Sequence, residues 1–314
     1  MSTDQIDLEK IHPELRDVYR RMPNLPMHNR LFLGLFNRLA KYVIKSPKPV
    51  DGVTITNQVI GSASVRIYRP CGELSGAGLL WIHGGGLIAG SVDMNDRDCS
   101  LYARDLNLVV VSVDYRLAPR HRFPSALDDC VSAWYWFQAS ALTLGVDPER
   151  IAVSGQSAGG GLAASLVQQL AAEGGIQPAA QALVYPMLDD RTAARQELDA
   201  LKHPMWNNRC NRAGWSWYLG QAPGAADLPA YSSAARQIDL TDLPTAWIGV
   251  GEIDLFYPEN CEYAARLQQA GVSCQLVSVP MAPHGFEAVA PRTAVARKFR
   301  ADFALFLREV LTLA

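Results

Sequence analysis

The stretch VSGQSAGGGLA, residues 153–163, decides the fold, because it places one serine between glycines where two structural patterns meet. The residues before it, RIAVS, have the composition of a β-strand, and the Ala- and Leu-rich residues after it begin a helix. A tight strand-to-helix turn needs backbone conformations or close approaches that a Cβ obstructs, which explains Gly155 and Gly159. The turn also puts Ser157 at a helix N-terminus, where unpaired N–H groups favour a developing negative charge. Ser157 is therefore a candidate nucleophile, and a simple N-cap serine is the alternative.

The rest of the chain alternates short β-rich runs with helical patterns. The first two β-runs are separated by GSA and alternate in polarity, which predicts an antiparallel hairpin. From residue 108 onward the runs are nearly all apolar, as strands buried on both faces are. Strand alternating with helix predicts an α/β fold with a mainly parallel sheet covered on both faces. We expect strands at 53–60, 64–69, 78–83, 108–115, 150–155, 180–186, 245–251 and 274–280, and helices at 95–106, 124–144, 157–173, 258–270 and 291–313.

Two regions break this rhythm. Residues 1–50 have a mostly helical pattern, and residues 187–243 carry no strand signal but are rich in tryptophan. A linker would be aromatic-poor, so both regions are expected to be helical additions packed over one edge of the sheet. Residues 51–186 and 244–314 then form the α/β domain.

A serine hydroxyl needs a base, and the base needs an orienting carboxylate. His284, in VPMAPHGFE, follows the last expected strand and so lies at the carboxyl edge of the sheet, where open α/β sheets bind ligands. Asp254, in VGEIDLFYPEN, also comes just past a strand, and Glu252 is its competitor. We prefer Asp254 because it lies further into the loop, and the order Ser157, Asp254, His284 is that of a known catalytic triad arrangement.

Besides the serine, the histidine and the aspartate, a glycine loop is the fourth candidate part of a catalytic site. In WIHGGGLIAGS, three glycines follow His83 directly after a strand. The chain has no G-x-x-x-x-G-K-[ST] motif and the loop is no dinucleotide fingerprint, so a phosphate cradle is not indicated. As an oxyanion hole, the N–H groups of Gly84 and Gly85 join that of Ala158, the residue after the serine.

Taken together, these motifs resemble the bacterial hormone-sensitive-lipase-like (family IV) carboxylesterases of the α/β-hydrolase fold. The residues that carry the resemblance are HGGG (83–86), VDYRLAPRHRFPSALDD (113–129), GQSAGG (155–160), LVYP (183–186), VGEIDLF (250–256) and HGF (284–286), and the similarity spans about residues 50–314. It implies an eight-stranded sheet and a helical cap built from residues 1–50 and 187–243. It also implies hydrolysis of small, short-acyl esters through an acyl-enzyme, without a metal or an organic cofactor. Homodimers are common in the family.

The resemblance also assigns supporting and pocket residues. The motif residues around the nucleophile and the glycine loop are His83, Gly86, Gly155, Gln156 and Gly159. The candidates for the substrate pocket are Leu87, Tyr185, Trp206, Trp215, Trp217 and Tyr218; as aromatics, at least two of these are expected to hold the cap together instead. Two positions depart from the family pattern: Gln156 and Arg120 stand where members commonly carry acidic residues.

Composition sets further bounds. The formal net charge is −2, with no block of Lys or Arg, so no footprint for nucleic acid is visible. The N-terminus has no apolar core of a secretory signal, and no apolar run reaches membrane-spanning length, so we expect a cytoplasmic protein. The six scattered cysteines form no CxxC pair, which indicates neither a zinc site nor a dithiol. An amidase, formamidase, lactonase or peptidase with the same triad stays open, as does a non-catalytic ligand receptor.

Overall fold

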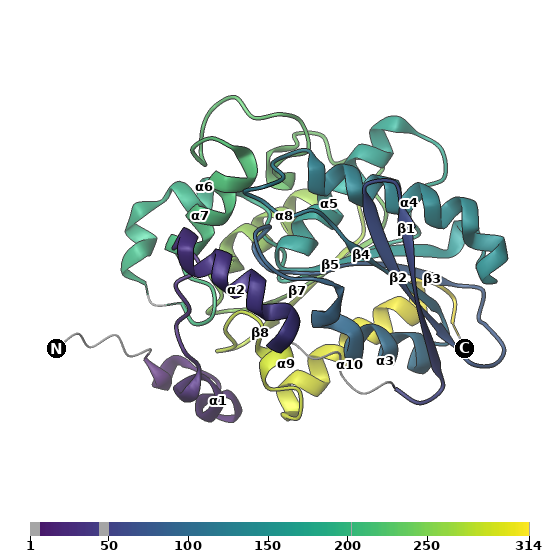
Figure 1. Cartoon of the computed structure of the whole chain (residues 1–314), viewed down its shortest axis with the longest axis horizontal. Helices are drawn as coiled ribbons and strands as arrows, with labels where there is room; N and C mark the ends of the chain where they lie inside the picture. The colour runs from purple at the N-terminus through teal and green to yellow at the C-terminus, as the bar shows by residue number, and fades with distance from the viewer. Residues whose placement is uncertain (1–6, 44–49, 202, 314) are drawn as a thin grey trace.

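The computed structural model describes residues 7–43, 50–201 and 203–313, so residues 1–6 and 44–49 of the expected N-terminal cap segment lie outside the described residues. One eight-stranded sheet runs through the molecule in the order β1-β2-β4-β3-β5-β6-β7-β8 (Figure 1). The strands are β1 Val53–Ile60, β2 Ala63–Pro70, β3 Gly78–Ile82, β4 Val109–Asp114, β5 Ile151–Gln156, β6 Gln181–Val184, β7 Ala246–Gly251 and β8 Cys274–Val279.

The sheet is mostly parallel, with its antiparallel part at one edge. β1 and β2 form the expected hairpin, with Ile60 paired to Ala63 beside the turn. β2 also pairs antiparallel with β4, and every pairing from β4 through β8 is parallel. The predicted α/β fold with an eight-stranded, mostly parallel sheet is confirmed.

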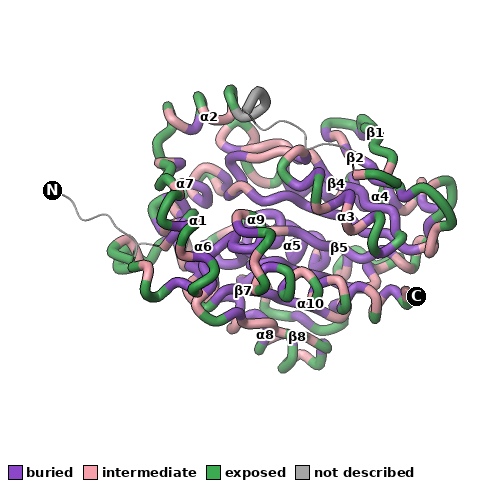
Figure 2. The backbone as a smooth tube through the Cα atoms, turned by 90° about the horizontal axis from the view of Figure 1, so that it is seen from below, coloured by how far each residue is buried: buried purple, intermediate pink, exposed green. Residues whose placement is uncertain are grey.

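Helices cover both faces of the sheet because side chains alternate along the strands. In β3, Leu80 and Ile82 join one apolar core with α4, α5 and α8, whereas Leu79 and Trp81 join a second core with α3 and α10. The buried backbone therefore runs through the middle of the molecule (Figure 2). The helices are α1 Arg16–Arg21, α2 Arg30–Val43, α3 Asp96–Leu106, α4 Ser125–Leu144, α5 Ala158–Glu173, α6 Asp190–Ala194, α7 Asn208–Leu219, α8 Tyr257–Gln269, α9 Phe286–Val289 and α10 Ala294–Val310.

The N-terminal region packs in two parts on different sides of the sheet. Helix α2 lies near the inserted α7 (Figure 1), and Leu33 of α2 shares the first core with Trp206 and Trp215. Asn37 of α2 donates a hydrogen bond to the carbonyl of Ile88, at 2.8 Å, just after the glycine loop. Residues 8–22 instead join the second core, on the side of α3 and α10.

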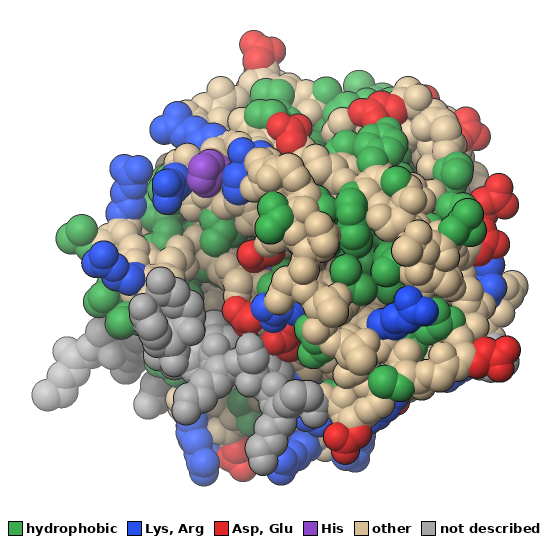
Figure 3. Space-filling view, turned by 45° about the vertical axis from the view of Figure 1, so that its right-hand side comes forward, with side chains coloured by type: hydrophobic (Ala, Val, Ile, Leu, Met, Phe, Trp, Pro, Cys, Tyr) green, Lys and Arg blue, Asp and Glu red, His purple; other side chains and the backbone are tan. Residues whose placement is uncertain are grey.

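On the face drawn in Figure 3, several basic side chains gather around a histidine at the upper left, and acidic side chains lie along the right-hand edge. Within the described residues, no helix combines the length and the hydrophobicity that a bilayer crossing requires. All six cysteines carry free thiols.

Candidate active site

The serine of the opening stretch occupies a strained turn between β5 and α5. Ser157 has φ 56° and ψ −119°, a conformation that non-glycine residues rarely adopt unless the surroundings impose it. A Cβ at Gly155 would lie 2.2 Å from the carbonyl oxygen of Gly159, and a Cβ at Gly159 would lie 2.1 Å from that of Ile82. Glycine at both positions is therefore a steric requirement, and the turn lifts the Ser157 hydroxyl above the sheet edge.

Three side chains from separate loops meet at this turn. His284 Nε2 lies 2.9 Å from Ser157 Oγ, and His284 Nδ1 lies 2.6 Å from Asp254 Oδ2. All three residues are buried, with exposures of 7% for Ser157, 6% for His284 and 3% for Asp254. Because the carboxylate holds Nδ1–H, Nε2 is left as the acceptor that faces the serine hydroxyl. Glu252, the competing carboxylate, is exposed and makes no contact with His284 among the described residues.

The glycine loop lies directly against the serine turn. A Cβ on Gly84 would come within 3.0 Å of the Gln156 carbonyl oxygen and 3.3 Å of Ser157 Cβ. Gly85, at φ 117°, has no room for a side chain, since a Cβ would lie 1.9 Å from the Ala89 carbonyl oxygen. Across the described chain, no acceptor is found for the N–H groups of Gly84, Gly85 and Ala158. Three backbone donors without a protein acceptor therefore lie in the glycine loop and the serine turn, on either side of the nucleophile.

His83 holds the backbone of the glycine loop in place. Its ring stacks on Tyr115 with centroids 4.2 Å apart, and its Nδ1 lies 2.7 Å from the Gly84 carbonyl oxygen. The Tyr115 hydroxyl donates to the carbonyl of His83 at 2.9 Å. Complete burial lowers the pKa of His83, so the ring stays neutral and its Nδ1–H donates to the loop. His83 therefore fixes the glycine backbone rather than taking part in proton transfer.

Gln156, the residue before the serine, is held by a buried polar cluster. Its Oε1 accepts a hydrogen bond from Asn95 Nδ2 at 3.1 Å, and its Nε2 donates to the Tyr185 hydroxyl and, at 3.2 Å, to Glu287 Oε1. The Tyr185 hydroxyl in turn donates to Glu287 at 2.5 Å. Burial raises the pKa of the Glu287 carboxyl. The Gln156 amide thus accepts one hydrogen bond through its oxygen and donates two through its nitrogen. A carboxyl group at this position could not donate both.

A cavity of about 290 Å³ opens over Ser157 and His284. Of the expected residues, it is lined by Gly84, Gly85, Gly86, Gln156, Tyr185 and Trp206. The indole of Trp206 stands so close to Gly86 that a Cβ there would lie 2.1 Å from the ring. Sequence reasoning missed the remaining walls, which include Met205, Ala288 and the ion pair of Arg300 with Asp98 at 3.0 Å.

Four of the expected pocket residues do not reach this cavity. Trp215 and Tyr218 are buried against one another, with ring centroids 6.1 Å apart, and Tyr218 also packs on Phe123. Trp217 and Leu87 belong to the same apolar core. The three residues of α7 pack inward because this helix must bury an apolar face, whereas Leu87 packs into the same core from the glycine loop. Arg120 is exposed in its loop and does not line the cavity either.

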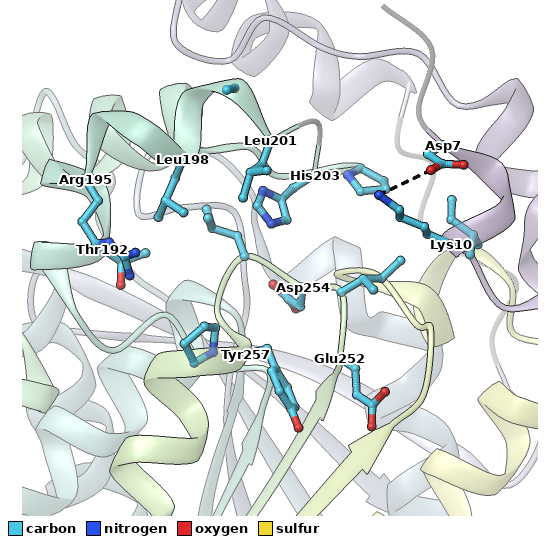
Figure 4. Close-up of a pocket in the computed structure, with 16 residues that line it drawn as sticks. Asp7, Lys10, Thr192, Arg195, Leu198, Leu201, His203, Glu252, Asp254 and Tyr257 are labelled. Atoms are coloured by element: carbon cyan, nitrogen blue, oxygen red, sulfur yellow. Dashed lines mark ion pairs between the residues drawn. The ribbon is translucent and has the colours of Figure 1, made fainter.

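A second, larger cavity lies on the far side of Asp254. It measures about 530 Å³, and Figure 4 shows His203, Glu252 and Lys10 around it together with Asp254. Neither Ser157 nor His284 lines it, so its size does not make it the site of chemistry. Burial lowers the pKa of His203, which keeps that ring neutral near the carboxylate. Among the described residues, no cluster of three or more His, Cys, Asp or Glu side chains is arranged to hold a metal ion.

Comparison with known proteins places these features in a family. Residues 79–288 match a family model described as alpha/beta hydrolase fold. The ethyl acetate hydrolase of Pseudomonas putida is 35% identical over 246 residues, 76% of each chain, and the esterase LipI of Mycobacterium tuberculosis is 32% identical over 286 residues, 89% of this chain and 81% of the relative. A bacterial heroin esterase of known structure superposes with a TM-score of 0.89 at 34% identity, covering 98% of this chain and 99% of the other. The matched segment contains the serine turn, the glycine loop, Asp254 and His284.

Proposed function

The chain belongs to the α/β-hydrolase fold family, in its bacterial hormone-sensitive-lipase-like branch, and from this we propose that it is a serine carboxylesterase for small, short-acyl esters. One observation carries the proposal: the hydrogen-bond series from Asp254 through His284 to Ser157 ends beside three free backbone N–H groups. A nucleophile, a base, an orienting carboxylate and oxyanion donors are the parts that acyl transfer needs. The names of the relatives, ethyl acetate hydrolase and esterase, support an ester as the substrate.

The proposed reaction has two acyl-transfer steps. Ser157 Oγ attacks the ester carbonyl carbon while its proton passes to His284 Nε2, and the N–H groups of Gly84, Gly85 and Ala158 bind the oxyanion. Collapse breaks the bond to the alcohol oxygen, which takes the proton from Nε2 and leaves an acyl-serine. Water then attacks the acyl carbon, His284 accepts a proton from it, and the carboxylic acid departs as Ser157 regains its proton. Asp254 stabilises the imidazolium formed in each step.

The size of the cavity supports a short acyl group. At about 290 Å³ it lies at the lower end of the range for small-molecule sites. We propose that residues 187–243 and α2 form a cap over it, with Trp206 and Met205 as the walls contributed by the inserted region. The amide of Gln156 and the hydroxyl of Tyr185 give the opposite wall a polar character without an ionised carboxylate next to the serine.

The test combines active-site labelling with a substrate panel. We expect a fluorophosphonate probe to label wild-type protein at Ser157, and Ser157→Ala to lose both labelling and ester hydrolysis while its melting temperature is kept. Ser154→Ala, which removes a buried hydroxyl from β5, the strand that leads into the serine turn, is the matched control and keeps turnover. The panel holds p-nitrophenyl esters of increasing acyl length together with an amide and a lactone. Residual hydrolysis by Ser157→Ala at the wild-type rate would refute the nucleophile, and faster turnover of the amide or lactone would replace ester as the substrate class.

A further inference from the structure

An N-terminal strap, defined here as residues 8–22, is bonded to the loop that carries the histidine. The His12 N–H donates to the carbonyl of Met281 at 2.8 Å, on one side of His284. On the other side, the Glu14 carboxylate accepts hydrogen bonds from the N–H groups of Ala294, at 2.6 Å, and Val295, at 3.3 Å, at the start of α10. The strap is therefore hydrogen-bonded to the chain before His284, at Met281, and after it, at the start of α10.

The strap also makes a hydrogen bond to His284 itself, which lies between the two contacted segments. The Tyr19 hydroxyl donates to the carbonyl oxygen of His284 at 2.8 Å, across 265 residues of sequence. Within the described chain, this hydroxyl is the one donor found for that carbonyl. Tyr19 is 1% exposed, and Ile11 and Leu15 are fully buried, so the strap is a part of the second core rather than a loose tail.

The histidine loop leaves the sheet before it reaches His284. β8 ends at Val279, five residues before His284, and the chain then passes through left-handed conformations at Met281 (φ 57°) and Gly285 (φ 69°). Backbone hydrogen bonds hold Ala282 and Gly285, but among the described residues no sheet pairing includes His284 itself. Both ring nitrogens must nevertheless be aimed, one at Asp254 and the other at Ser157. A displacement of the order of 1 Å at such a group costs about a hundredfold in rate.

We propose that Tyr19 is a positioning residue for the catalytic histidine. Its hydroxyl fixes the His284 carbonyl and thereby sets the direction in which the ring points. Burial raises the pKa of Tyr19, so the hydroxyl keeps its proton and remains a donor. Tyr19 does not line the cavity over Ser157, so it acts on the rate of the chemical steps rather than on the binding of the substrate. This inference rests on the proposed function, in which His284 is the base.

The test removes one hydroxyl and compares it with another. In Tyr19→Phe we expect kcat for a short-acyl p-nitrophenyl ester to fall by about tenfold, below the full cost of a misplaced group because the ring still packs, with KM unchanged. The matched control is Tyr263→Phe, since Tyr263 is equally buried, accepts a hydrogen bond from Gln168 at 2.9 Å, and does not line the cavity over Ser157. Tyr263→Phe should keep the wild-type kcat even if it lowers the melting temperature by as much as Tyr19→Phe does.

A second readout follows the histidine directly. The proton on His284 Nδ1, shared with Asp254, gives a low-field proton NMR signal, which we expect to shift in Tyr19→Phe and to stay in place in Tyr263→Phe. If Tyr19→Phe yields no folded protein, Glu14→Ala takes its place, because Glu14 is exposed and its loss removes the hydrogen bonds of the strap to the start of α10; about a threefold fall in kcat is then expected.

The outcomes separate this inference from the proposed function. A wild-type protein without Ser157-dependent hydrolysis defeats the proposed function itself. A wild-type enzyme that turns over, together with a Tyr19→Phe variant of equal kcat and an unmoved low-field signal, defeats the positioning role alone. A rise in KM with kcat unchanged also overturns it, because it would place Tyr19 in substrate binding.

Discussion

Replacement of Gln156 by glutamate would place a second carboxyl group in the cluster beside the nucleophile. The Gln156 amide nitrogen lies 3.2 Å from Glu287 Oε1 and also donates to the Tyr185 hydroxyl. In Gln156→Glu that nitrogen becomes an oxygen facing the Glu287 carboxylate. The variant also restores the acidic residue that the family commonly carries before the serine, so it isolates what the amide contributes in this chain.

The repulsion can be estimated from the distance. Two unit charges 3.2 Å apart interact with about 5 kcal/mol at an effective dielectric constant of 20, and a relaxed separation of about 5 Å leaves about 3 kcal/mol. The pair therefore retains one proton well above the usual range of a glutamic acid. With that proton in place, the introduced carboxyl group can still donate to Glu287 as the amide does.

The direction of the pH dependence follows from proton counting. In the folded variant the pair holds one proton more than the two separate glutamates of the unfolded chain, whose pKa is about 4.3. The free energy of unfolding therefore falls as pH rises above about 4.3, until the shared proton is lost. Burial already raises the pKa of Glu287 in the wild type, which gives the same sign with a smaller amplitude.

The assay is a series of thermal melts from pH 4 to 9, with kcat/KM measured at each pH. We expect the melting temperature of Gln156→Glu to match wild type at the acid end and to fall about 5 °C below it at the alkaline end, with kcat/KM falling in parallel. The double variant Gln156→Glu/Glu287→Gln exchanges the amide and the carboxyl, and should recover the wild-type profile. If the melting temperatures of Gln156→Glu and wild type changed with pH in the same way, the side chain at position 156 would not face Glu287.

Three further changes test other parts of the site. Asp254→Asn should lower kcat about 10⁴-fold, because the amide stabilises the wrong tautomer of His284. Glu252→Gln should keep the wild-type kcat, and equal losses in the two variants would reopen the choice between the two carboxylates. Gly86→Ala should lower kcat/KM about tenfold, since its Cβ would lie 2.1 Å from the Trp206 ring. Gly61 has a similar φ of 62° and no atom within 4 Å of a Cβ, so Gly61→Ala should keep the wild-type kcat/KM. Equal kcat/KM in the two variants would argue against the packing of Trp206 on the glycine loop. Trp206→Ala should raise the ratio of kcat/KM for long- over short-acyl esters about tenfold, and an unchanged ratio would remove Trp206 from the pocket wall.

Local patterns predicted the parts of the fold that local physics determines. Apolar runs bounded by turn residues located each of the eight strands to within two residues, as in the expected 274–280 and the observed Cys274–Val279. Steric need for glycine located the serine turn, and the position of Asp254 and His284 after strands brought both to one edge of the sheet. These inferences succeed because parallel strands end together, whatever the loops do.

The remaining parts depend on contacts that no local pattern records. Tryptophan and tyrosine in 206–218 indicated a packed region, but their composition could not say that Trp215 and Tyr218 face each other while Trp206 faces the glycine loop. Glu287, three residues after His284, has no sequence signature of its partnership with Gln156. Tyr19 lies outside the matched family segment, and its partner is 265 residues away.

That distance along the chain has a consequence for biosynthesis. Ile11, Leu15 and Tyr19 leave the ribosome long before α10 and the histidine loop, which help to bury them. At a synthesis rate of about 5–20 residues per second, a separation of 265 residues leaves this apolar trio without its partner for roughly 13 to 53 seconds. The serine turn can form early, between β5 and α5, but the base is not in place until the histidine loop has been made. The nascent chain thus carries an inert serine and an uncovered apolar segment until the histidine loop and α10 emerge.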